Sequence, residues 1–282
     1  MTGGKKAIIT ASALVLAAAA VAVTVIAVDE RVTVRTVGIS SDKVDGEVRL
    51  LHLSDLHSSL YGEGQSKLLS KIEQLSPDAI LLTGDIYENR ITNENSEALL
   101  SALGQKYMCF YVSGNHEVAT RELSKIKKQI ASFGITVLEG ETSVISVNGQ
   151  KISVSGIDDP LAFPDKKGRL WEDQLSDCNG EIENGRFSVL LTHRPELADY
   201  YVETDFDLIL SGHAHGGQVI IPGIINGLYA PHQGFFPEYA GGTFELKPSQ
   251  TMVVSRGLSK YVRPRIFNRP ELVMIEITPE KQ

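Results

Sequence analysis

The stretch that decides the fold is ILLTGD at residues 80–85, where an apolar run ends at a glycine and then an aspartate. Similar stretches occur earlier in LLHLSD, where Ser54 precedes Asp55, and later in FYVSGN, where Gly114 precedes Asn115. Both intervals, from Asp55 to Asp85 and from Asp85 to Asn115, are thirty residues, a length typical of a β-α-β repeat. Because ligands in open α/β folds bind beyond the carboxyl ends of the strands, we expect these side chains to meet in one crevice.

Two later apolar runs end in the same way. VLLT leads into His193, and LILSG leads into the histidine pair of HAH. Gly84, Gly114 and Gly212 stand directly before these polar residues, where the chain must turn sharply without a Cβ. A single histidine beside a strand is usually structural, but five of the seven in one kind of position are hard to explain by packing. These five are His57, His116, His193, His213 and His215.

The whole pattern predicts one α/β domain with two facing sheets. Alternating strands and helices predict β-α-β units early in the chain, and glycine-punctuated strands at 144–147, 151–155 and 218–221 predict antiparallel pairs later. Residues 159–186 are the least regular, and we expect an inserted loop or lid there. Helical spacing is found at 65–75, 93–103, 121–133 and 195–202. Further strands are expected at 31–37, 48–53, 79–82, 108–112, 152–154, 187–191, 208–210, 252–254 and 272–277.

Composition and charge exclude several classes of protein. The chain has 282 residues, of which 42% are hydrophobic and 22% charged, as in ordinary globular proteins. Its formal charge is −8, and because Lys5 and Lys6 are the only charges before Asp29, the remainder carries −10. Such an acidic body disfavours a nuclease and nucleic acid as a partner. The only cysteines are Cys109, expected as a buried thiol, and Cys178, in polar surroundings; we expect no bridge between them.

The N-terminus has the features of a membrane anchor. Residues 7–28 carry no charge and, as a helix, would be about 33 Å long, enough for a hydrocarbon core of roughly 30 Å. Lysines precede the segment and acidic residues follow it, which places residues 1–6 in the cytoplasm and the body outside. We therefore expect a single-pass signal-anchor in the cell membrane, a linker and edge strand at 29–47, and an extracytoplasmic catalytic domain at 48–282. A cleaved signal peptide is the main alternative, and a buried soluble helix is another.

The expected crevice has the ligands of a metal site. Oxygen and imidazole ligands without a thiolate favour manganese, iron, zinc or cobalt over calcium or a structural cysteine-rich zinc site. There are enough ligands for two ions, and a carboxylate is the natural bridge because each of its oxygens can bond one ion. Two ions roughly 3.5–4 Å apart can clamp phosphoryl oxygens and lower the pKa of a bridging water. The residues therefore indicate hydrolysis at phosphorus.

In chain order the motifs are D-x-H, G-D, G-N-H-E, H and G-H-x-H, and this set resembles the calcineurin-like metallophosphoesterase superfamily. The resemblance covers about residues 48–277. It implies a four-layer sandwich of two central sheets flanked by helices, and two divalent ions per chain, manganese first among them. The stretches HRPE at 193–196, GHAHGGQ at 212–218 and FNRPEL at 267–272 are similar to a bacterial membrane-associated branch. Some members of that branch are phosphodiesterases, and some cleave the pyrophosphate of UDP-2,3-diacylglucosamine.

The resemblance also implies roles for individual residues. His116 would protonate the leaving group or stabilise charge in the transition state, and Asp85 would bridge the two ions. No substrate-binding residue is identified. One ion would be held by Asp55, His57, Asp85 and His215, and the other by Asp85, Asn115, His193 and His213.

We therefore expect a membrane-anchored, monomeric, two-metal phosphoesterase. A metal-activated hydroxide would attack the phosphorus of a phosphodiester or pyrophosphate, and the substrate would be lipid-linked or a nucleotide-lipid. One alternative is a phosphomonoesterase or protein phosphatase with the same site. A non-catalytic metal-binding module is another alternative, from a different class of function.

Several other residues have two interpretations each. Glu117 is either a carboxylate that orients a ligand histidine or an ordinary helix-start residue. His52, between two leucines of a strand, is either packed or a ligand, and we expect it to be packed. His232 either contacts substrate or is an ordinary loop residue, and we expect the loop residue.

Two surface features near the C-terminus also have functional and structural interpretations. The apolar tract at 220–225 and the aromatic residues at 235–239 are either a lip for acyl chains or ordinary loop packing. A basic cluster could contact phosphate or anionic headgroups, or form a solvated face; it consists of Lys260, Arg263, Arg265 and Arg269.

Overall fold

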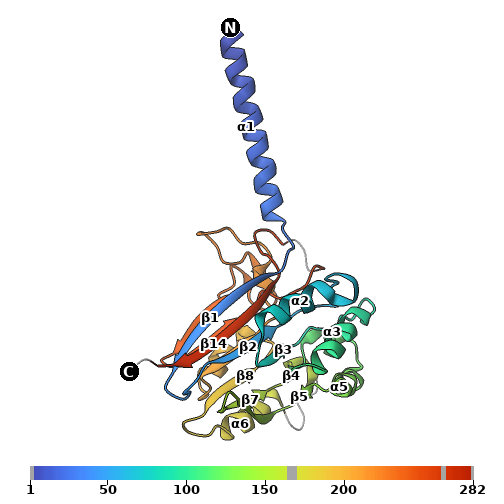
Figure 1. Cartoon of the computed structure of the whole chain (residues 1–282), viewed down its shortest axis with the longest axis vertical. Coiled ribbons are helices and arrows are strands. Elements are labelled where there is room, and N and C mark those ends of the chain that lie inside the picture. Colours follow the sequence, from blue (N-terminus) through green and yellow to red (C-terminus); the bar gives the residue numbers. More distant parts are fainter. Residues whose placement is uncertain (1–2, 164–169, 262–264, 281–282) are drawn as a thin grey trace.

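Within the described residues, two six-stranded β-sheets form the centre of the molecule (Figure 1). The computed structural model describes residues 3–163, 170–261 and 265–280, with only the backbone given for 3–11 and 13. Side chains along each central strand alternate between the two faces of the sheet. In one strand, Leu81 packs between the sheets, whereas Ile80 and Leu82 pack outward against helices. Both faces are therefore buried, as the continuous apolar runs of the sequence predict.

The first sheet has the strand order β1-β14-β2-β3-β4-β5. Strands β2 to β5 are parallel, and β14 is antiparallel to β2. At the edge, β1 pairs in parallel with β14, from Thr33 opposite Glu271 to Ser41 opposite Pro279. The predicted edge strand is thus part of this sheet. The bounds are β1 (Thr33–Ser41), β2 (Val48–Leu53), β3 (Ala79–Thr83), β4 (Met108–Val112), β5 (Thr136–Val137) and β14 (Glu271–Pro279).

The second sheet has the strand order β12-β13-β9-β8-β7-β6. Its four inner strands are parallel, and the two edge strands pair antiparallel with their neighbours. The predicted antiparallel pair at 144–147 and 151–155 is confirmed by the pairing of β6 with β7. The bounds are β6 (Glu141–Val147), β7 (Gln150–Gly156), β8 (Phe187–Leu191), β9 (Leu208–Ser211), β12 (Gly242–Lys247) and β13 (Gln250–Val254).

Helices cover the outer faces of both sheets, which gives the expected four layers. The apolar sides of α2, α3 and α5 pack on the first sheet, and those of α6 and α7 pack on the second. The bounds are α2 (Ser66–Leu75), α3 (Glu94–Gly104), α5 (Leu123–Ser132), α6 (Trp171–Gly180) and α7 (Ala198–Tyr201). Shorter elements are η1 (Glu63–Gln65), α4 (Asn115–Ala119), η2 (Pro160–Ala162), η3 (Pro195–Leu197), η4 (His215–Gly217), β10 (Tyr229–Ala230) and β11 (Gly234–Phe235).

Two predictions of local structure are wrong. The segment 159–186 is not a continuous loop, because it contains α6, whose Trp171, Leu175 and Cys178 are buried in the core of the second sheet. Residues 164–169 of that segment lie outside the described residues. The expected strand at 218–221 forms only isolated bridges, because Gln218 has a left-handed φ of 63° and cannot continue an extended strand.

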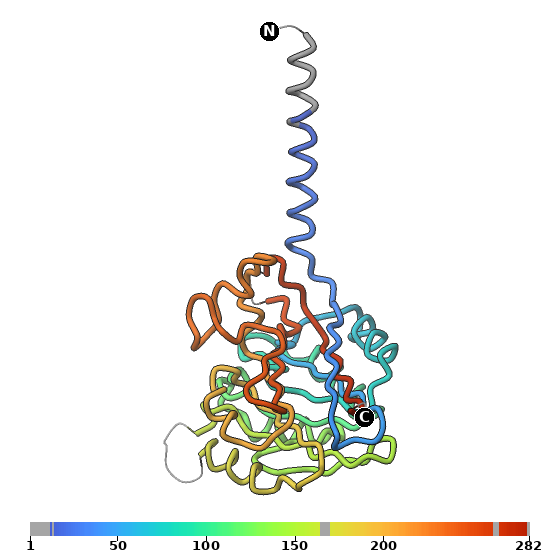
Figure 2. Tube along the Cα trace, turned by 90° about the vertical axis from the view of Figure 1, so that its left-hand side faces the viewer, coloured from blue at the N-terminus to red at the C-terminus, as the bar shows by residue number. Residues whose placement is uncertain are grey.

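Helix α1 (Gly3–Ala27) extends away from the body of the molecule (Figures 1 and 2). At its base, the backbone N–H of Phe267 donates to the carbonyl of Ala27 at 2.7 Å. Most of its described apolar side chains are exposed, among them Leu16 at 70%, whereas Ala27 at its base is buried. In the part of the chain that the structure describes, no helix has both the length and the apolar character needed to cross a membrane. Of the expected N-terminal segments, residues 1 and 2 and the side chains of 3–11 and 13 lie outside the described residues.

Candidate metal centre

The residues predicted as ligands follow the strand ends of both sheets. In the first sheet, β2 leads to Asp55 and His57, β3 leads to Asp85, and β4 leads to Asn115. In the second sheet, β8 leads to His193, and β9 leads to the pair of histidines in HAH. The two sheets lie against each other at β3 and β8. Two strand edges therefore meet at one site, and each sheet supplies part of the ligand set.

A first group of potential ligands lies around His57. One ligand atom each of Asp55, His57, Asp85 and His215 can be chosen so that all lie within 4.8 Å of one another. The Nε2 atom of His57 is 3.6 Å from Asp85 Oδ2 and 3.9 Å from Asp55 Oδ1. The Nε2 atom of His215 is 3.5 Å from Asp55 Oδ1. These atoms converge on one point at distances longer than ordinary hydrogen bonds.

A second group lies on the other side of Asp85. Ligand atoms of Asp85, His193 and His213 also lie within 4.8 Å of one another. The Nε2 atom of His193 is 3.3 Å from Asp85 Oδ2 and 3.2 Å from Asn115 Oδ1. Asp85 is thus common to both groups. Six of the seven residues predicted as ligands lie in these two groups, and the seventh, Asn115, contacts His193 beside them.

The buried carboxylate and imidazole groups of the site do not fully satisfy one another by hydrogen bonds, and a divalent cation would satisfy them. The side chains of Asp55, Asp85, His57 and His193 are at most 1% exposed. Among the described residues, His57 Nε2 has no hydrogen-bond partner although it is buried. A buried polar atom without a partner is uncommon and calls for an explanation such as a bound ion. Two adjacent buried carboxylates beside such an atom provide the negative charge that a cation would compensate.

The pKa of His193 also indicates that the buried carboxylates of the site lack a compensating positive charge. Burial opposes protonation of His193, yet the neighbouring Asp85 carboxylate outweighs burial and raises the pKa of this imidazole to about 10. Burial, together with neighbouring cationic groups, lowers the pKa of His213 and His215 well below the usual range. These two rings are therefore neutral and retain a nitrogen lone pair that can bind a metal.

The backbone of the ligand loops is strained. A left-handed conformation costs a residue other than glycine about 1–2 kcal/mol. Such conformations collect at functional sites, where the surrounding structure enforces them. The left-handed φ values here are 53° at Asp55, 48° at His57, 52° at Asp85, 66° at His213 and 49° at His215.

Two glycines allow the ligand loops to approach each other. A Cβ at Gly212 would collide with Ser54 Oγ and Asp55 Oδ2, and a Cβ at Gly114 would collide with Asp85 Oδ1. The sequence predicts a turn at these positions, and the structure adds that each glycine lies directly against a carboxylate of the site. Any side chain there would displace a potential ligand.

Glu88 is the main site residue that the sequence analysis missed. Its Oε2 is 3.0 Å from His57 Nδ1, and its Oε1 is 3.0 Å from His116 Nδ1. The carboxylate therefore fixes both rings and leaves the Nε2 atom of each directed elsewhere. Burial opposes protonation of His116, but the hydrogen bond to Glu88 and the charge of Asp85 raise the pKa of this ring. The only feature of the sequence that could have pointed to Glu88 is its position three residues after Asp85.

Glu117 has a different role from the one considered in the sequence analysis. Among the described residues, it makes no hydrogen bond to a histidine of the site. Its carboxylate accepts hydrogen bonds from the backbone N–H groups of Asp85, Tyr87 and Gly114, each at 2.9 Å. It therefore joins the loops after β3 and β4. The orientation of His193 comes instead from a carbonyl, because its Nδ1 lies 2.7 Å from Thr83 O.

Arg194 and His232 lie at the rim of the site, although the sequence analysis assigned neither of them a role there. Arg194 Nη1 is 3.0 Å from His213 Nε2, and the guanidinium is paired with Asp159 at 3.1 Å (Nη2 to Oδ1). The exposed ring of His232 stacks on His213 with a centroid distance of 5.4 Å. Together with Glu196, these two histidines form a further cluster of potential ligands. His232 is thus a loop residue, as expected, but the loop brings it to the site.

His52, the two cysteines and the described residues of the basic cluster belong to neither group of potential ligands around Asp85. His52 is packed in the core, where its Nε2 is 2.7 Å from Thr83 Oγ1. Cys109 and Cys178 are both free and buried, so the expectation of polar surroundings for Cys178 is wrong. The described members of the basic cluster do not form one surface. Arg265 is buried and donates to Asn268 O at 3.2 Å, whereas Lys260 and Arg269 line a pocket. Arg263 lies outside the described residues.

Comparison with known proteins agrees with this geometry. The family model described as "Calcineurin-like phosphoesterase" matches residues 48–217. An uncharacterised metallophosphoesterase of Campylobacter jejuni is 28% identical over 255 residues, with 88% of this chain and 64% of the relative covered. The phosphodiesterase YaeI of Escherichia coli is 28% identical over 236 residues, with 81% of this chain and 82% of the relative covered. This chain therefore spans less than two thirds of the length of the Campylobacter relative.

A solved structure shares the architecture. The 5′-nucleotidase precursor of Thermus thermophilus aligns with a TM-score of 0.52 and 15% identity, covering 76% of this chain and 50% of the nucleotidase. At this identity the similarity concerns the fold alone. It agrees with the two mixed sheets and their flanking helices.

Proposed function

The chain belongs to the calcineurin-like phosphoesterase family, and we propose that it hydrolyses phosphodiester or pyrophosphate bonds at the two ligand groups that share Asp85. Membership of this family makes it a metal-dependent phosphoester hydrolase. The observation that supports the proposal is that Asp85 belongs to both groups of potential ligands, as a carboxylate that bridges two cations would. The relative named as a phosphodiesterase supports a diester as substrate.

Each side chain has a specific task in this proposal. Asp55, His57 and His215 complete the first cation site, and Asn115, His193 and His213 complete the second. Cations held by these residues would supply Lewis-acid polarisation of the phosphoryl group and would lower the pKa of a bound water molecule. Manganese is our first choice for the metal because the donors are oxygen and imidazole.

His116 is proposed as the proton donor to the leaving oxygen. Its ring is 26% exposed, whereas the ring of His57 beside it is fully buried. The two rings are in edge contact, with centroids 4.5 Å apart. Because Glu88 holds Nδ1 of His116, the other ring nitrogen is free to face a substrate in the crevice.

The test uses the full chain, purified without metal. We expect hydrolysis of bis(p-nitrophenyl) phosphate that depends on added Mn²⁺ and exceeds the rate on p-nitrophenyl phosphate. Asp85→Asn should abolish it, whereas Asp45→Asn, which removes an exposed carboxylate elsewhere, should not. A higher rate on the monoester would assign the site to a phosphomonoesterase. Absence of both metal binding and turnover would contradict a hydrolytic function.

We extend the proposal to the location of the protein. The uncharged segment 7–28, with charges on both sides, supports a single-pass anchor and an extracytoplasmic catalytic domain. In water, the exposed apolar side chains of α1 would be costly. Membranes washed with alkaline carbonate should retain the full chain, and protease added to intact spheroplasts should cleave its body. Release by carbonate would contradict the anchor.

A lipid-linked substrate is the finer part of the proposal. Phe235 and Phe236 are 71% and 66% exposed, and they follow closely on His232 at the rim of the site. Phe235→Ser with Phe236→Ser should therefore lower the rate on a lipid diester in vesicles more than the rate on a soluble ester. Equal losses on both substrates would contradict a role in handling lipid.

A further inference from the structure

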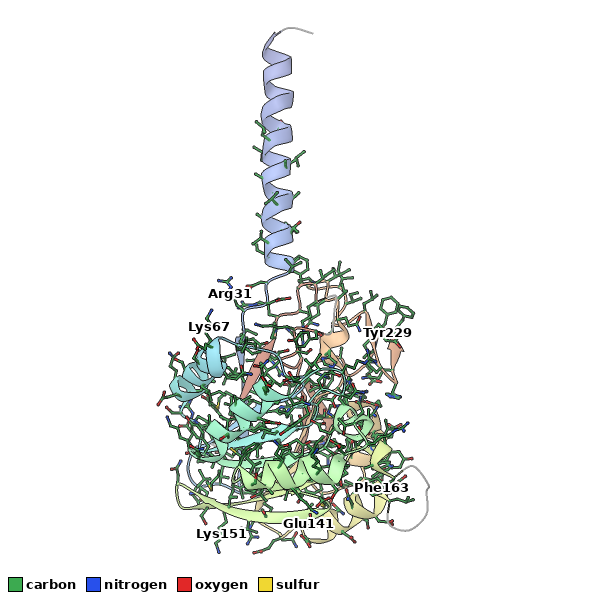
Figure 3. All side chains as sticks on the ribbon, turned by 90° about the vertical axis from the view of Figure 1, so that its right-hand side faces the viewer. Arg31, Lys67, Glu141, Lys151, Phe163 and Tyr229 are labelled. Carbon is green, nitrogen blue, oxygen red and sulfur yellow. The ribbon has the colours of Figure 1, made fainter. Side chains whose placement is uncertain are left out.

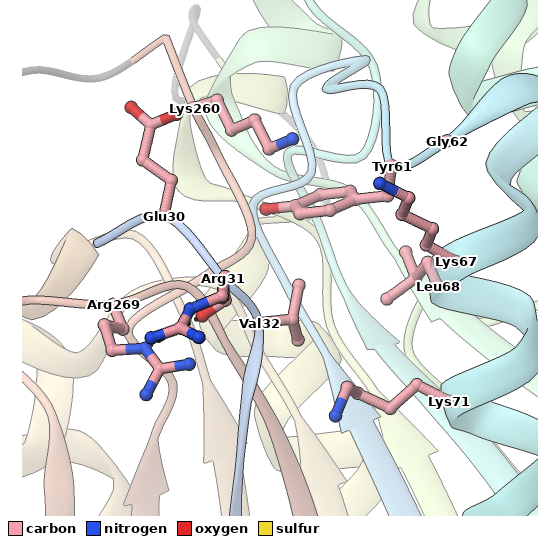
Figure 4. Close-up of a pocket in the computed structure, with 10 residues that line it drawn as sticks. All are labelled: Glu30, Arg31, Val32, Tyr61, Gly62, Lys67, Leu68, Lys71, Lys260 and Arg269. Carbon is pink, nitrogen blue, oxygen red and sulfur yellow. Dashed lines mark hydrogen bonds between the residues drawn. The ribbon is translucent and has the colours of Figure 1, made fainter. Parts of the chain in front are cut away.

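We propose that a cavity at the base of α1, separate from the metal centre, binds the phosphate group of an anionic phospholipid. The cavity has a volume of about 580 Å³ and lies between α2 and the segment that follows α1 (Figure 4). We call it the base cavity. Neither ligand group of the metal centre contributes a residue to it. Its basic lining residues are Arg31, Lys67, Lys71, Lys260 and Arg269.

The charge of the base cavity is opposite to that of the molecule. The body of the chain carries −10, yet this one cavity gathers five cationic side chains and a single carboxylate, that of Glu30. Two of the cations, Arg31 and Arg269, contact Asp29 at 2.9 Å and 3.3 Å. Lys67 and Lys71 make no ion pair with any described residue. The lining is therefore suited to an anion with more than one acceptor oxygen, such as a phosphate.

The two unpaired lysines are placed to act together. They are four residues apart on α2, so both extend from the same face of the helix. In Figure 4 their side chains and that of Arg269 border the cavity from opposite sides. Burial lowers the pKa of Lys260; the charge of Glu30 opposes this effect, and the charge of Lys67 adds to it. An anion in the cavity would relieve the repulsion between these ammonium groups.

The cavity also has an apolar wall, which free phosphate would not need. Val32, Leu68 and Tyr61 form this wall, and Leu68 and Tyr61 are nearly buried. The ring of Tyr61 lies 4.0 Å below the ammonium of Lys260, and its hydroxyl donates to Leu258 O. A cationic lining beside an apolar wall matches a molecule that joins a phosphate to a glycerol and acyl chains.

The position of the base cavity selects a lipid as the source of that phosphate. Glu30, Arg31 and Val32 follow the end of α1 within five residues. Arg31 and Lys67 lie at the end of the body from which α1 projects (Figure 3). If α1 is in the bilayer, as proposed above, this end faces the headgroup layer, where basic side chains attract anionic lipid. The inference rests on the proposed location but not on the proposed reaction.

The experiment measures ligand binding without activity. The full chain in uncharged detergent, with EDTA present, is titrated separately with dihexanoyl phosphatidylglycerol, dihexanoyl phosphatidylcholine and inorganic phosphate, and the shift in Tm is followed. We expect phosphatidylglycerol to raise Tm, with an apparent Kd at least tenfold weaker in Lys67→Glu/Lys71→Glu. The matched control, Lys128→Glu/Lys151→Glu, reverses two exposed lysines elsewhere and should bind as the wild type does; Lys151 lies at the opposite end of the body (Figure 3).

The outcomes separate the possible sources of the anion. Stabilisation by phosphatidylglycerol but not by inorganic phosphate assigns the base cavity to a lipid. Equal stabilisation by inorganic phosphate, lost in the same double variant, assigns it to free phosphate. Unchanged binding in Lys67→Glu/Lys71→Glu, or equal binding of phosphatidylcholine, overturns the proposal. Lys67→Gln/Lys71→Gln repeats the test if charge reversal impairs folding.

A final comparison distinguishes this proposal from the proposed reaction. Hydrolysis of bis(p-nitrophenyl) phosphate should be unchanged in the lysine variants, and Asp85→Asn should retain lipid binding. Failure of the hydrolase assay would therefore leave the lipid measurement valid. Failure of the lipid measurement would likewise leave the hydrolase assay valid.

Discussion

Asp85 lies between two imidazole groups and also accepts the backbone N–H of His116 at 2.8 Å. Its own backbone N–H donates to Glu117, so both ends of the residue are fixed before any cation binds. Its φ of 52° shows that the loop bends to place the carboxylate there. A preorganised carboxylate loses little freedom when it binds a cation, which is how a rigid site gains affinity.

Glu88 is expected to determine metal affinity although it belongs to neither ligand group around Asp85. Glu88→Gln keeps the shape of the side chain but removes the charge that faces the rings of His57 and His116. Loss of such a supporting partner typically weakens metal binding by about 10–100-fold. We expect the Mn²⁺ concentration for half-maximal activity to rise by about that factor. Glu203→Gln, at an exposed position, is the control, and an unchanged Mn²⁺ dependence of Glu88→Gln would contradict this role.

Gly212→Ala is expected to damage the site through a single methyl group. The new Cβ would collide with Asp55 Oδ2 and Ser54 Oγ, so a ligand loop must move. Overpacking of this kind typically costs about 1–3 kcal/mol of unfolding free energy. Urea denaturation should show that loss, together with weaker metal binding. Gly38→Ala, where the added Cβ meets no atom within 4 Å, should leave both quantities unchanged; equal stability of the two variants would contradict the steric argument.

The clustering of the potential ligands could be predicted from the sequence, whereas the residues that hold them in position could not. Each ligand follows an apolar strand directly, and the chain supplies the same signal five times. Glu88 and His232 reach the site from loops. The conformation of a loop depends on contacts with residues far away in the sequence, so the sequence pattern does not predict where its side chains lie. Arg194 was visible beside His193, but its contact with His213 depends on how β8 pairs with β9.

At the level of elements, the strands and helices were predictable wherever the apolar pattern was strong. The predicted strands at 48–53, 108–112 and 187–191 agree with β2, β4 and β8 at both ends. Helix α6 was missed because Pro160, Pro164 and Gly168 precede it and its buried face is short. Only Trp171, Leu175 and Cys178 mark that face, together with one glutamine.

Helix α6 is expected to contribute stability rather than to close the site. Leu175 is 6% exposed in the core of the second sheet. Leu175→Ala should therefore lower the unfolding free energy by about 2–4 kcal/mol, measured by urea denaturation. The kcat of the folded fraction should stay within about twofold of the wild type. A large fall in kcat with unchanged stability would instead indicate that the segment acts as a lid.

Burial also determines the reactivity of the two thiols. Burial raises the pKa of both Cys109 and Cys178 to about 12, so each is a neutral thiol at physiological pH. We expect neither to react with 5,5′-dithiobis(2-nitrobenzoic acid) in the native protein, and two per chain to react after denaturation. One fast-reacting thiol in the native state would show that its core cluster opens locally.

In the molecule as a whole, the candidate metal centre lies where the two sheets meet. Asp55 and Asp85 come from the first sheet, and His193 and His213 come from the second. Without cations, the carboxylates must be compensated by protons, as the raised pKa of His193 shows. Cations at this seam would replace that compensation and hold the sheets together through bonds that the unfolded chain cannot form.

Metal should therefore stabilise the fold as well as supply the chemistry. A ligand that binds only the native state at about 100 times its Kd adds about 2.7 kcal/mol. For a chain of this size that corresponds to a rise in Tm of roughly 5–10 °C. We expect Mn²⁺ to raise Tm of the metal-stripped full chain by this amount, and EDTA to reverse it. Asp85→Asn should show almost no Mn²⁺-dependent shift, because its loss weakens both ligand groups; an equal shift in Asp85→Asn would place the stabilising ion elsewhere in the chain.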